Sequence, residues 1–363
     1  KLPRQSTRVT ASDLLASLHL QLSNCAFFTF HISTIQNPEH NRYASASARN
    51  YALGLLTVVY SFNFIDRQLL SILQESIKLE LTLSDSQLGL LTGFAFAVFY
   101  VTAGIPIARW ADRSNRRNIV ALSVGLWSLM TAVSGSVQNY AQLLLARIGV
   151  GVGEAGGSPP SHSIISDIFP PEKRASAIAF YSTGVNIGIL FGFLLGGWLN
   201  EYFGWRIAFV VVGVPGLLLA VLVRLTLAEP LRGLAEKKQV SDEQVPFSAV
   251  VALLWSRLSF RHLAFAGALN AFAGYSTANW TASFMIRSHD MTTGELGTWL
   301  AMIMGFGGAI GVFCGGLIAD KLAPRDKRWY VWLPALTGMV CVPFMASVYL
   351  VDNPYTALTL SII

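Results

Sequence analysis

The sequence predicts an all-α polytopic membrane protein, and three observations lead to that fold class. Of its 363 residues, 53% are hydrophobic and only 13% are charged, whereas about a quarter of the residues of a soluble domain are charged. The apolar residues gather in runs of about 20, the length at which an α-helix crosses the hydrocarbon core of a bilayer. Basic residues concentrate in alternate loops between these runs. This composition excludes a soluble globular domain, a disordered chain and a disulfide scaffold.

Searching the chain for apolar runs of about 20 residues gives nine spans and the start of a tenth. Short polar loops with Gly or Pro separate many of them. Residues 1–48 are too polar for a span, and we expect them to be disordered or non-native. Because the chain begins with Lys and stops inside an apolar run, we expect it to be a piece of a longer protein. In chain order the predicted spans are 51–73, 88–108, 119–137, 141–169, 175–199, 207–227, 263–286, 298–319, 331–351 and 355–363.

Loop charge predicts the orientation of these spans. The net charge is +6, and the basic residues follow the even-numbered spans, as the positive-inside rule requires of cytoplasmic loops. The amino terminus and the long central loop are therefore predicted to be cytoplasmic, in the plasma membrane (the inner membrane of a bacterium). Because topology accounts for the positive charge, no nucleic-acid partner is expected. The basic residues after the even-numbered spans include Arg109, Arg113, Arg116, Arg117, Lys173, Arg174, Arg257, Arg261 and Lys321.

The longest loop divides the chain into two sets of spans. It covers 228–262, and its first part is polar. From Pro246 to His262 apolar residues mix with arginines, which indicates either an amphipathic helix on the inner membrane surface or a connector helix packed on the spans. We therefore expect a six-helix unit over 49–227, a cytoplasmic linker, and a second unit over 263–363.

Two loops at equivalent places in these units carry similar sequences. Residues 108–117 read ARWADRSNRR after the second span, and residues 316–321 read GLIADK after the eighth. Each has a small residue four positions before an Asp and a basic residue after it. This pattern resembles the G-x-x-x-D-(R/K)-x-G-R-(R/K) loop of the major facilitator superfamily, although the first copy has Ala108 and Asn115 where the family usually has glycine.

Three further stretches are similar to the spinster-like branch of that superfamily: 63–68 (NFIDRQ), 147–159 (RIGVGVGEAGGSP) and 169–175 (FPPEKRA). The resemblance covers about 50–363. It implies the major facilitator fold, with a complete N-terminal six-helix bundle and an incomplete C-terminal bundle that lacks the last two spans and most of the tenth. It also implies transport by alternating access.

Four ionisable residues lie inside predicted spans, where an Asp or Arg costs about 2.5–3.5 kcal/mol on insertion scales. A rise of 1.5 Å per residue puts Asp66 roughly 12 Å and Arg147 roughly 9 Å below the outer boundary, so the two charges can meet. Glu154 lies about two turns deeper than Arg147 on the same helix face. We interpret Asp66 as the main proton acceptor, Arg147 as its partner and Glu154 as a second titrating site, roles that the resemblance also implies. Arg67 either joins this group or snorkels outward, and the alternative for all four is a static salt-bridge cluster.

The loop residues suggest a gate between the two bundles. By analogy with the family, they would form an interdomain charge latch, and the alternative is a plain basic membrane anchor. Glycines recur every four residues from Gly184 to Gly196, a spacing that favours close helix packing. The residues of the expected latch are Asp112, Arg113, Arg116, Arg117, Asp167 and Asp320.

Polar and aromatic residues in the first and seventh spans are candidates for a solute cavity. They could line it with apolar and hydrogen-bonding groups, although interfacial aromatics and helix–helix hydrogen bonds explain them equally well. The candidates are Tyr60, Asn63, Asn270, Tyr275, Asn279 and Trp280.

These features predict a monomeric secondary transporter of an organic, amphipathic or lysolipid-like solute, coupled to protons. No cofactor or metal is expected. A non-coupled lipid scramblase or facilitator is the main alternative. An intramembrane enzyme is disfavoured because the sequence has no Gly-x-Ser-x-Gly elbow, His-Glu-x-x-His pair or Walker loop.

Overall fold

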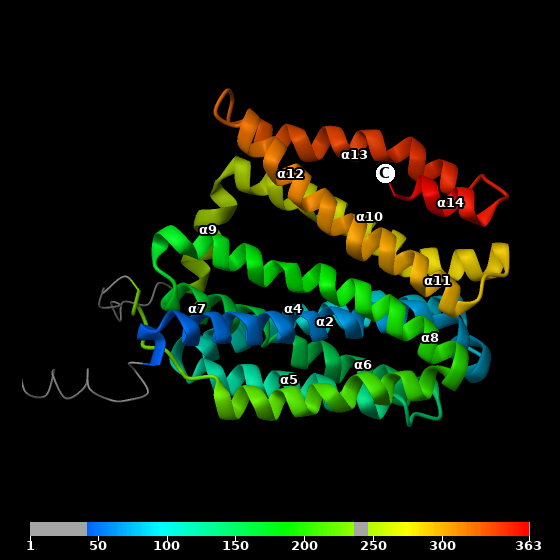
Figure 1. Ribbon diagram of the computed structural model, residues 1–363, viewed down its shortest axis with the longest axis horizontal. Helices are drawn as coiled ribbons and strands as arrows, with labels where there is room; N and C mark the ends of the chain where they lie inside the picture. Colours follow the sequence, from blue (N-terminus) through cyan, green and yellow to red (C-terminus); the bar gives the residue numbers. More distant parts are fainter. Residues whose placement is uncertain (1–41, 236–245, 363) are drawn as a thin grey trace, which may run out of the picture.

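A computed structural model describes residues 42–235 and 246–362, and helices make up nearly all of that part of the chain (Figure 1), which confirms the predicted fold class. One short 3₁₀ turn (η1) and two π-helical turns (η2, η3) interrupt or precede the α-helices. In chain order the elements are η1 (Arg42–Ala44), α2 (Ala46–Leu81), α3 (Asp85–Gly89), η2 (Leu90–Phe94), α4 (Ala95–Arg113), α5 (Arg116–Ser134), α6 (Tyr140–Glu154), α7 (Ser158–Ile168), α8 (Pro171–Thr226), α9 (Phe247–Ser256), α10 (Leu258–His289), α11 (Thr293–Leu300), η3 (Ala301–Gly307), α12 (Gly308–Leu322), α13 (Trp329–Val348) and α14 (Pro354–Leu360).

Within the described residues, each predicted span overlaps a helix or a run of helices, and a turn breaks the fourth span between α6 and α7. By length and composition, 5 helical segments of the described chain can cross a membrane, or 6 if the bent pair α9 and α10 counts as one span. This number is below the predicted nine because α8 alone contains two predicted spans. In addition, Asp66 and Arg67 interrupt the apolar run of α2, and a turn separates α6 from α7.

Helix α8 is a helical hairpin with a one-residue break. Its only non-helical residue is Gly204, at φ 81° and ψ 161°, a positive φ that glycine adopts without steric cost. The chain reverses there, and the second arm of α8 runs back beside α5 (Figure 1). The loop predicted between the spans 175–199 and 207–227 is thus reduced to a single residue, because the helix continues through Phe203.

The glycines of the first α8 arm allow α2 to approach closely. A Cβ added at Gly188 would lie 2.5 Å from the carbonyl oxygen of Ser61, and one at Gly184 would lie 2.8 Å from that of Thr57. Such backbone approach is what small residues at four-residue spacing permit between membrane helices. The stripe therefore serves packing in this structure.

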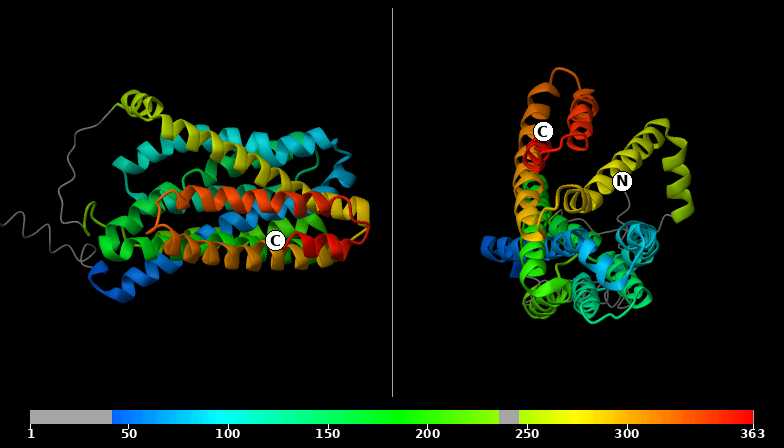
Figure 2. Two further views of the ribbon diagram at one scale, coloured as in Figure 1. Left: turned by 90° about the horizontal axis from the view of Figure 1, so that it is seen from above. Right: turned by 90° about the vertical axis from the view of Figure 1, so that its right-hand side faces the viewer.

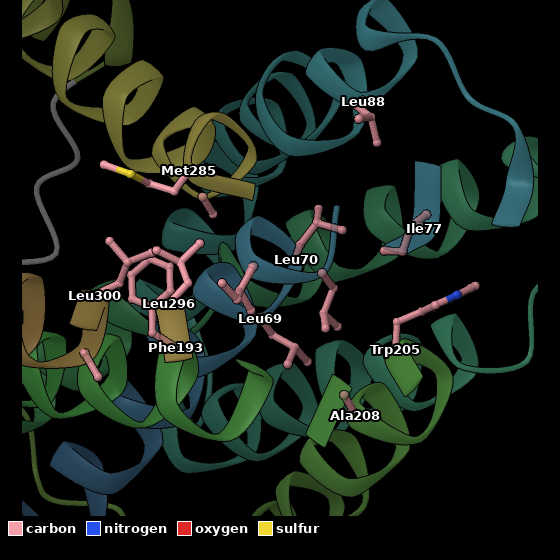
Figure 3. Close-up of a cluster of buried hydrophobic side chains, with 14 of the residues drawn as sticks. Leu69, Leu70, Ile77, Leu88, Phe193, Trp205, Ala208, Met285, Leu296 and Leu300 are labelled. Atoms are coloured by element: carbon pink, nitrogen blue, oxygen red, sulfur yellow. The ribbon is translucent and has the colours of Figure 1, made fainter. Parts of the chain in front are cut away.

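A buried apolar cluster joins the two units at one end (Figure 3). Leu69 and Leu70 of α2, Phe193 of α8, Met285 of α10 and Leu296 of α11 all belong to it. Burial of these side chains holds α10 and α11 against α2 and α8.

The opposite half of α10 is uncovered. From Leu258 to Ser276 every residue of α10 is exposed, whereas Thr281 and Met285 are buried. Figure 2 shows α9 and the start of α10 standing apart from α12 and α13. The two units thus make contact at the end away from the basic loops.

The segment expected to be amphipathic is split in two. Helix α9 bends by 93° into α10 at Arg257. Valine, leucine, alanine and tryptophan residues occupy most positions of α9, so its apolar residues are not confined to one face. The polar side of the expected helix is absent because Arg257 and Arg261 lie beyond the end of α9.

Candidate functional site

Asp66 and Arg147 form a buried ion pair between α2 and α6. Arg147 Nη1 donates to Asp66 Oδ2 at 2.9 Å, and the two side chains are only 3% and 2% exposed. The Thr131 hydroxyl of α5 donates to the other carboxylate oxygen, Oδ1, at 2.6 Å. The Asp66 carboxylate of α2 therefore bonds to residues of two other helices, α5 and α6. The rise per residue also predicts that Asp66 and Arg147 lie at the same depth.

A second buried pair lies beside the first. Arg67 Nε donates to Glu154 Oε2 at 2.8 Å, and the Glu154 side chain has no exposed surface. The Arg67 guanidinium lies 5.0 Å from the ring centroids of Phe64 and Phe96, within cation–π range. It also lies 5.2 Å from the ring centroid of Tyr100. Arg67 is thus turned into the protein, in contrast to the snorkelling alternative.

The sequence places Arg147 and Glu154 on one face of the same helix, and the structure pairs each of them with a different residue of α2. Consecutive residues of α2 point about 100° apart around the helix, so Asp66 meets Arg147 while Arg67 meets Glu154. Glu154 therefore has a cationic partner on another helix instead of sharing Arg147 along its own. The two helices α2 and α6 are therefore joined by two separate ion pairs, Asp66 with Arg147 and Arg67 with Glu154.

Each pair retains unused hydrogen-bonding capacity. Among the described residues, Arg147 Nε, Glu154 Oε1 and Asn63 Oδ1 are buried and have no hydrogen-bond partner. Buried polar atoms are rarely left in this state. The site can therefore accept a proton, a water molecule or a polar group of a solute.

Glycines of α6 bring the neighbouring helices up to these charges. A Cβ at Gly153 would lie 2.7 Å from the backbone nitrogen of Trp127 in α5. One at Gly151 would lie 3.1 Å from the carbonyl oxygen of Phe96 in α4. The glycine-rich run of α6 thus permits the tight packing that buries Glu154.

The candidate cavity residues fall into two groups. Tyr275 Oη lies 3.4 Å from Arg67 Nη1, and Tyr60 stacks on Tyr181 at a centroid distance of 4.5 Å. The backbone carbonyl of Asn279, by contrast, accepts a hydrogen bond of 2.7 Å from Gln74. The structure therefore brings some candidates toward Arg67 and others to the α2–α10 contact. Their exposure also varies: Asn63 is buried, Tyr60, Asn279 and Trp280 are half-buried, and Asn270 and Tyr275 are exposed.

The latch candidate Arg116 lies in a buried charge cluster. It is buried, pairs with Asp167 of α7 and donates from Nε to Glu229 Oε1 at 2.8 Å. Its Nη2 donates to the carbonyl of Pro230 at 2.8 Å. Sequence reasoning missed Glu229, and its position directly after the sixth span was the available signal.

The other latch candidates lie near this cluster or far from it. The Arg117 backbone N–H donates to Glu229 at 2.8 Å. Asp112 and Arg113 are exposed at the end of α4, and Asp320 is exposed in α12. The contacts of Arg116 thus link α5, α7 and the residues just after α8.

A charge cluster at the opposite end was not anticipated. Arg287 of α10 lies 2.7 Å from Glu75 of α2 and 2.6 Å from Asp85 of α3. Lys78 also lies 2.6 Å from Asp85. These pairs connect the second unit to the first beside the buried apolar cluster.

Comparisons with known proteins agree with this architecture. Residues 56–363 match the model of the Major Facilitator Superfamily. The chain is 34% identical over 305 residues to an MFS-type efflux pump of Mycolicibacterium smegmatis, a match that covers 83% of this chain and 70% of that protein. It is 27% identical over 325 residues to a probable galactarate/D-glucarate transporter of Bacillus subtilis, covering 81% of this chain and 70% of the relative.

A solved structure is similar over most of the chain. It is a bacterial homolog to the human lysosomal transporter Spinster, crystallised in an inward-facing and unoccupied conformation. The TM-score is 0.78 at 36% sequence identity, and the match covers 88% of this chain and 72% of the other.

Proposed function

Because this chain belongs to the major facilitator superfamily and is a multi-pass membrane transporter related to the spinster-like proteins, we propose that it moves an organic, amphipathic or lipid-like solute by proton-coupled alternating access. The proposed division of the chain is an N-terminal bundle over 49–227, a linker over 228–262 and part of a C-terminal bundle over 263–363, of which residues 236–245 and 363 lie outside the described part. The proposed location is a bacterial inner membrane, with the basic loops in the cytoplasm.

The observation that carries the coupling proposal is the Asp66–Arg147 pair. Proton uptake by Asp66 removes the charge that Arg147 needs, and a buried charge without a partner is unfavourable. The pair therefore separates or rearranges when Asp66 is protonated. Thr131 keeps the carboxyl in place by its hydrogen bond of 2.6 Å. Arg67 and Glu154 provide a second pair that responds in the same way.

The contacts between the two units support alternating access. Arg287, Glu75 and Asp85 join the units at one end, whereas α10 is exposed from Leu258 to Ser276 at the other. We propose that this arrangement is the inward-facing state, and that Arg116, Asp167 and Glu229 hold the cytoplasmic end of the first bundle. Asp112, Arg113, Arg117 and Asp320 would then form contacts across the bundles when the cytoplasmic side closes.

The surroundings of Arg67 support an amphipathic solute. One cationic group lies among the rings of Phe64, Phe96 and Tyr100, and Tyr275 adds a hydroxyl. An anionic or polar head could compete with Glu154 for Arg67, while an apolar portion contacts the rings. Tyr60, Asn63, Asn270, Asn279 and Trp280 complete the proposed cavity.

A transport screen tests this proposal. The full-length protein is reconstituted into liposomes and offered lysophospholipids, sphingoid phosphates and sugar acids, with and without a pH gradient. We expect one amphipathic class to accumulate above its external concentration only when the gradient is present. Equal movement in both conditions would support the facilitator or scramblase alternative instead.

A further inference from the structure

We infer that a groove between the start of α2 and the start of α8 binds an anionic phospholipid of the surrounding bilayer. The groove has a volume of about 590 Å³ and is open to the protein surface. Its lining includes Asn50 and Leu53 of α2 and Lys173, Ser176 and Phe180 of α8. None of these residues belongs to the proposed transport or coupling sites.

The groove opens onto the lipid-facing side of α8. Phe180, Ile187 and Phe191 are 53%, 42% and 44% exposed, and spacings of seven and four residues put them on one helix face. An exposed apolar face on a membrane-crossing helix lies against acyl chains. The groove occupies the end of this face nearest the basic loops, so a lipid can enter it sideways from the bilayer.

Along α8 the lining changes from polar to apolar, and Phe169 at the end of α7 adds one apolar side chain near Lys173. Lys173 lies in the first turn of α8, which begins at Pro171, and Phe180 lies about 10 Å further along the axis. Polar Ser176 is near the Lys173 end, whereas Leu53 and Phe180 are apolar. A molecule with a polar head and a hydrocarbon tail matches this order, with its head at Lys173.

Charge selects an anionic head. Lys173 is exposed and lies near the N-terminus of α8, where the helix dipole also favours negative charge. Glu172 is the adjacent acidic residue, but it points about 100° away around the helix. The phosphodiester of phosphatidylglycerol carries a net negative charge, unlike the zwitterionic head of phosphatidylcholine. This inference uses the membrane topology of the chain and is independent of the transported solute.

Native mass spectrometry of the full-length protein in detergent tests the assignment, with phosphatidylglycerol, phosphatidylcholine and inorganic phosphate as probes. We expect phosphatidylglycerol to bind at least fivefold more tightly than phosphatidylcholine. Lys173→Gln should lower its affinity about fivefold, and Ser176→Phe, which fills the groove, should remove the site. Both residues are exposed, and thermal unfolding in detergent checks that the variants are folded.

The matched control is Lys321→Gln, which removes an exposed lysine of α12 outside the groove. This variant should bind phosphatidylglycerol like the parent protein. An equal loss of phosphatidylglycerol affinity in Lys173→Gln and Lys321→Gln would contradict a specific site. It would indicate diffuse attraction of the lipid to basic residues instead. Full competition by inorganic phosphate would reassign it to a soluble anion, and unchanged binding by Ser176→Phe would contradict the groove. If the proposed transport function were wrong, these lipid-binding measurements would still test the groove, because none of them depends on transport.

Discussion

The carboxylate of Asp66 lies 2.9 Å from the guanidinium of Arg147, and neither side chain is more than 3% exposed. The pair lies where α2 and α6 meet, with Thr131 of α5 as a third participant. The folded protein loses most stability when only one partner of such a buried pair changes its charge, because the other charge is then left unpaired. The first prediction follows from that asymmetry.

Asp66→Asn should reduce gradient-driven accumulation at least tenfold while leaving solute exchange across the liposome membrane measurable. The amide keeps the size of the side chain and can still accept from Thr131, but it cannot take up a proton. The measurement is uptake by proteoliposomes with and without a pH gradient. Asp352→Asn, in an exposed loop, is the control and should behave like the parent. Undiminished accumulation by Asp66→Asn would exclude Asp66 from coupling.

Arg67→Gln and Glu154→Gln should each lower stability by about 3–5 kcal/mol, since either change leaves one buried partner without its counter-ion. The double variant should lose much less than the sum of the two single losses. The measurement is thermal unfolding, in detergent, of the parent protein, the two single variants and the double variant. Arg224→Gln, at an exposed position of α8, should change stability by no more than about 0.5 kcal/mol. Strictly additive losses would mean that the pair does not contribute as a unit.

Arg287→Met should increase access to the contact between α2 and α10 from the outside. Arg287 joins α10 to Glu75 and Asp85, and Ser71 lies in the same contact through its bond to the Ala278 carbonyl. With Ser71→Cys in a background lacking the native cysteines, labelling by a membrane-impermeant maleimide should rise several-fold.

Arg206→Met provides the control for this labelling experiment. Arg206 of α8 pairs with Glu80 of α2, so this pair lies within the proposed N-terminal bundle, on the same side of the protein. Its loss should leave the labelling of Ser71→Cys unchanged. Equal labelling in the Arg287 and Arg206 variants would show that the α10 pairs do not hold the outer side closed.

Gly188→Ala should destabilise the protein by about 1–3 kcal/mol through overpacking. Its Cβ would lie 2.5 Å from the Ser61 carbonyl oxygen and from Phe64 Cβ, so α2 and α8 would have to move apart. Gly267→Ala is the matched control, because nothing lies within 4 Å of that position and alanine favours a helix by up to about 1 kcal/mol over glycine. Opposite shifts in thermal unfolding temperature are expected, and a stabilised Gly188→Ala would contradict the packing role.

Apolar run length was sufficient to predict where the helices lie, because a bilayer span has a nearly constant length. Depth along the helix likewise brought Asp66 and Arg147 to one level. The partner of Arg67 could not be predicted in this way, since a rise per residue gives height but not the direction of a neighbouring helix. Glu154 was therefore predicted only as a second titrating site, without a partner.

Contacts between distant segments were the least predictable. Loop-charge statistics identify a side of the membrane, yet they contain no information on which residue meets Arg287. Glu75 and Asp85 approach it only because α10 packs against α2. The role of Glu229 was hidden for a similar reason, as its partner Arg116 is 113 residues away.

The single-residue turn at Gly204 has a mechanical consequence. One arm of α8 packs on α2 and α11, and the other packs on α5, where a Cβ at Gly213 would lie 2.5 Å from the Ala132 backbone nitrogen. With no slack between the arms, a push on the first from the neighbouring unit cannot be absorbed locally. We therefore expect the hairpin to transmit this displacement across the proposed first bundle, so that the bundle tilts as one rigid body.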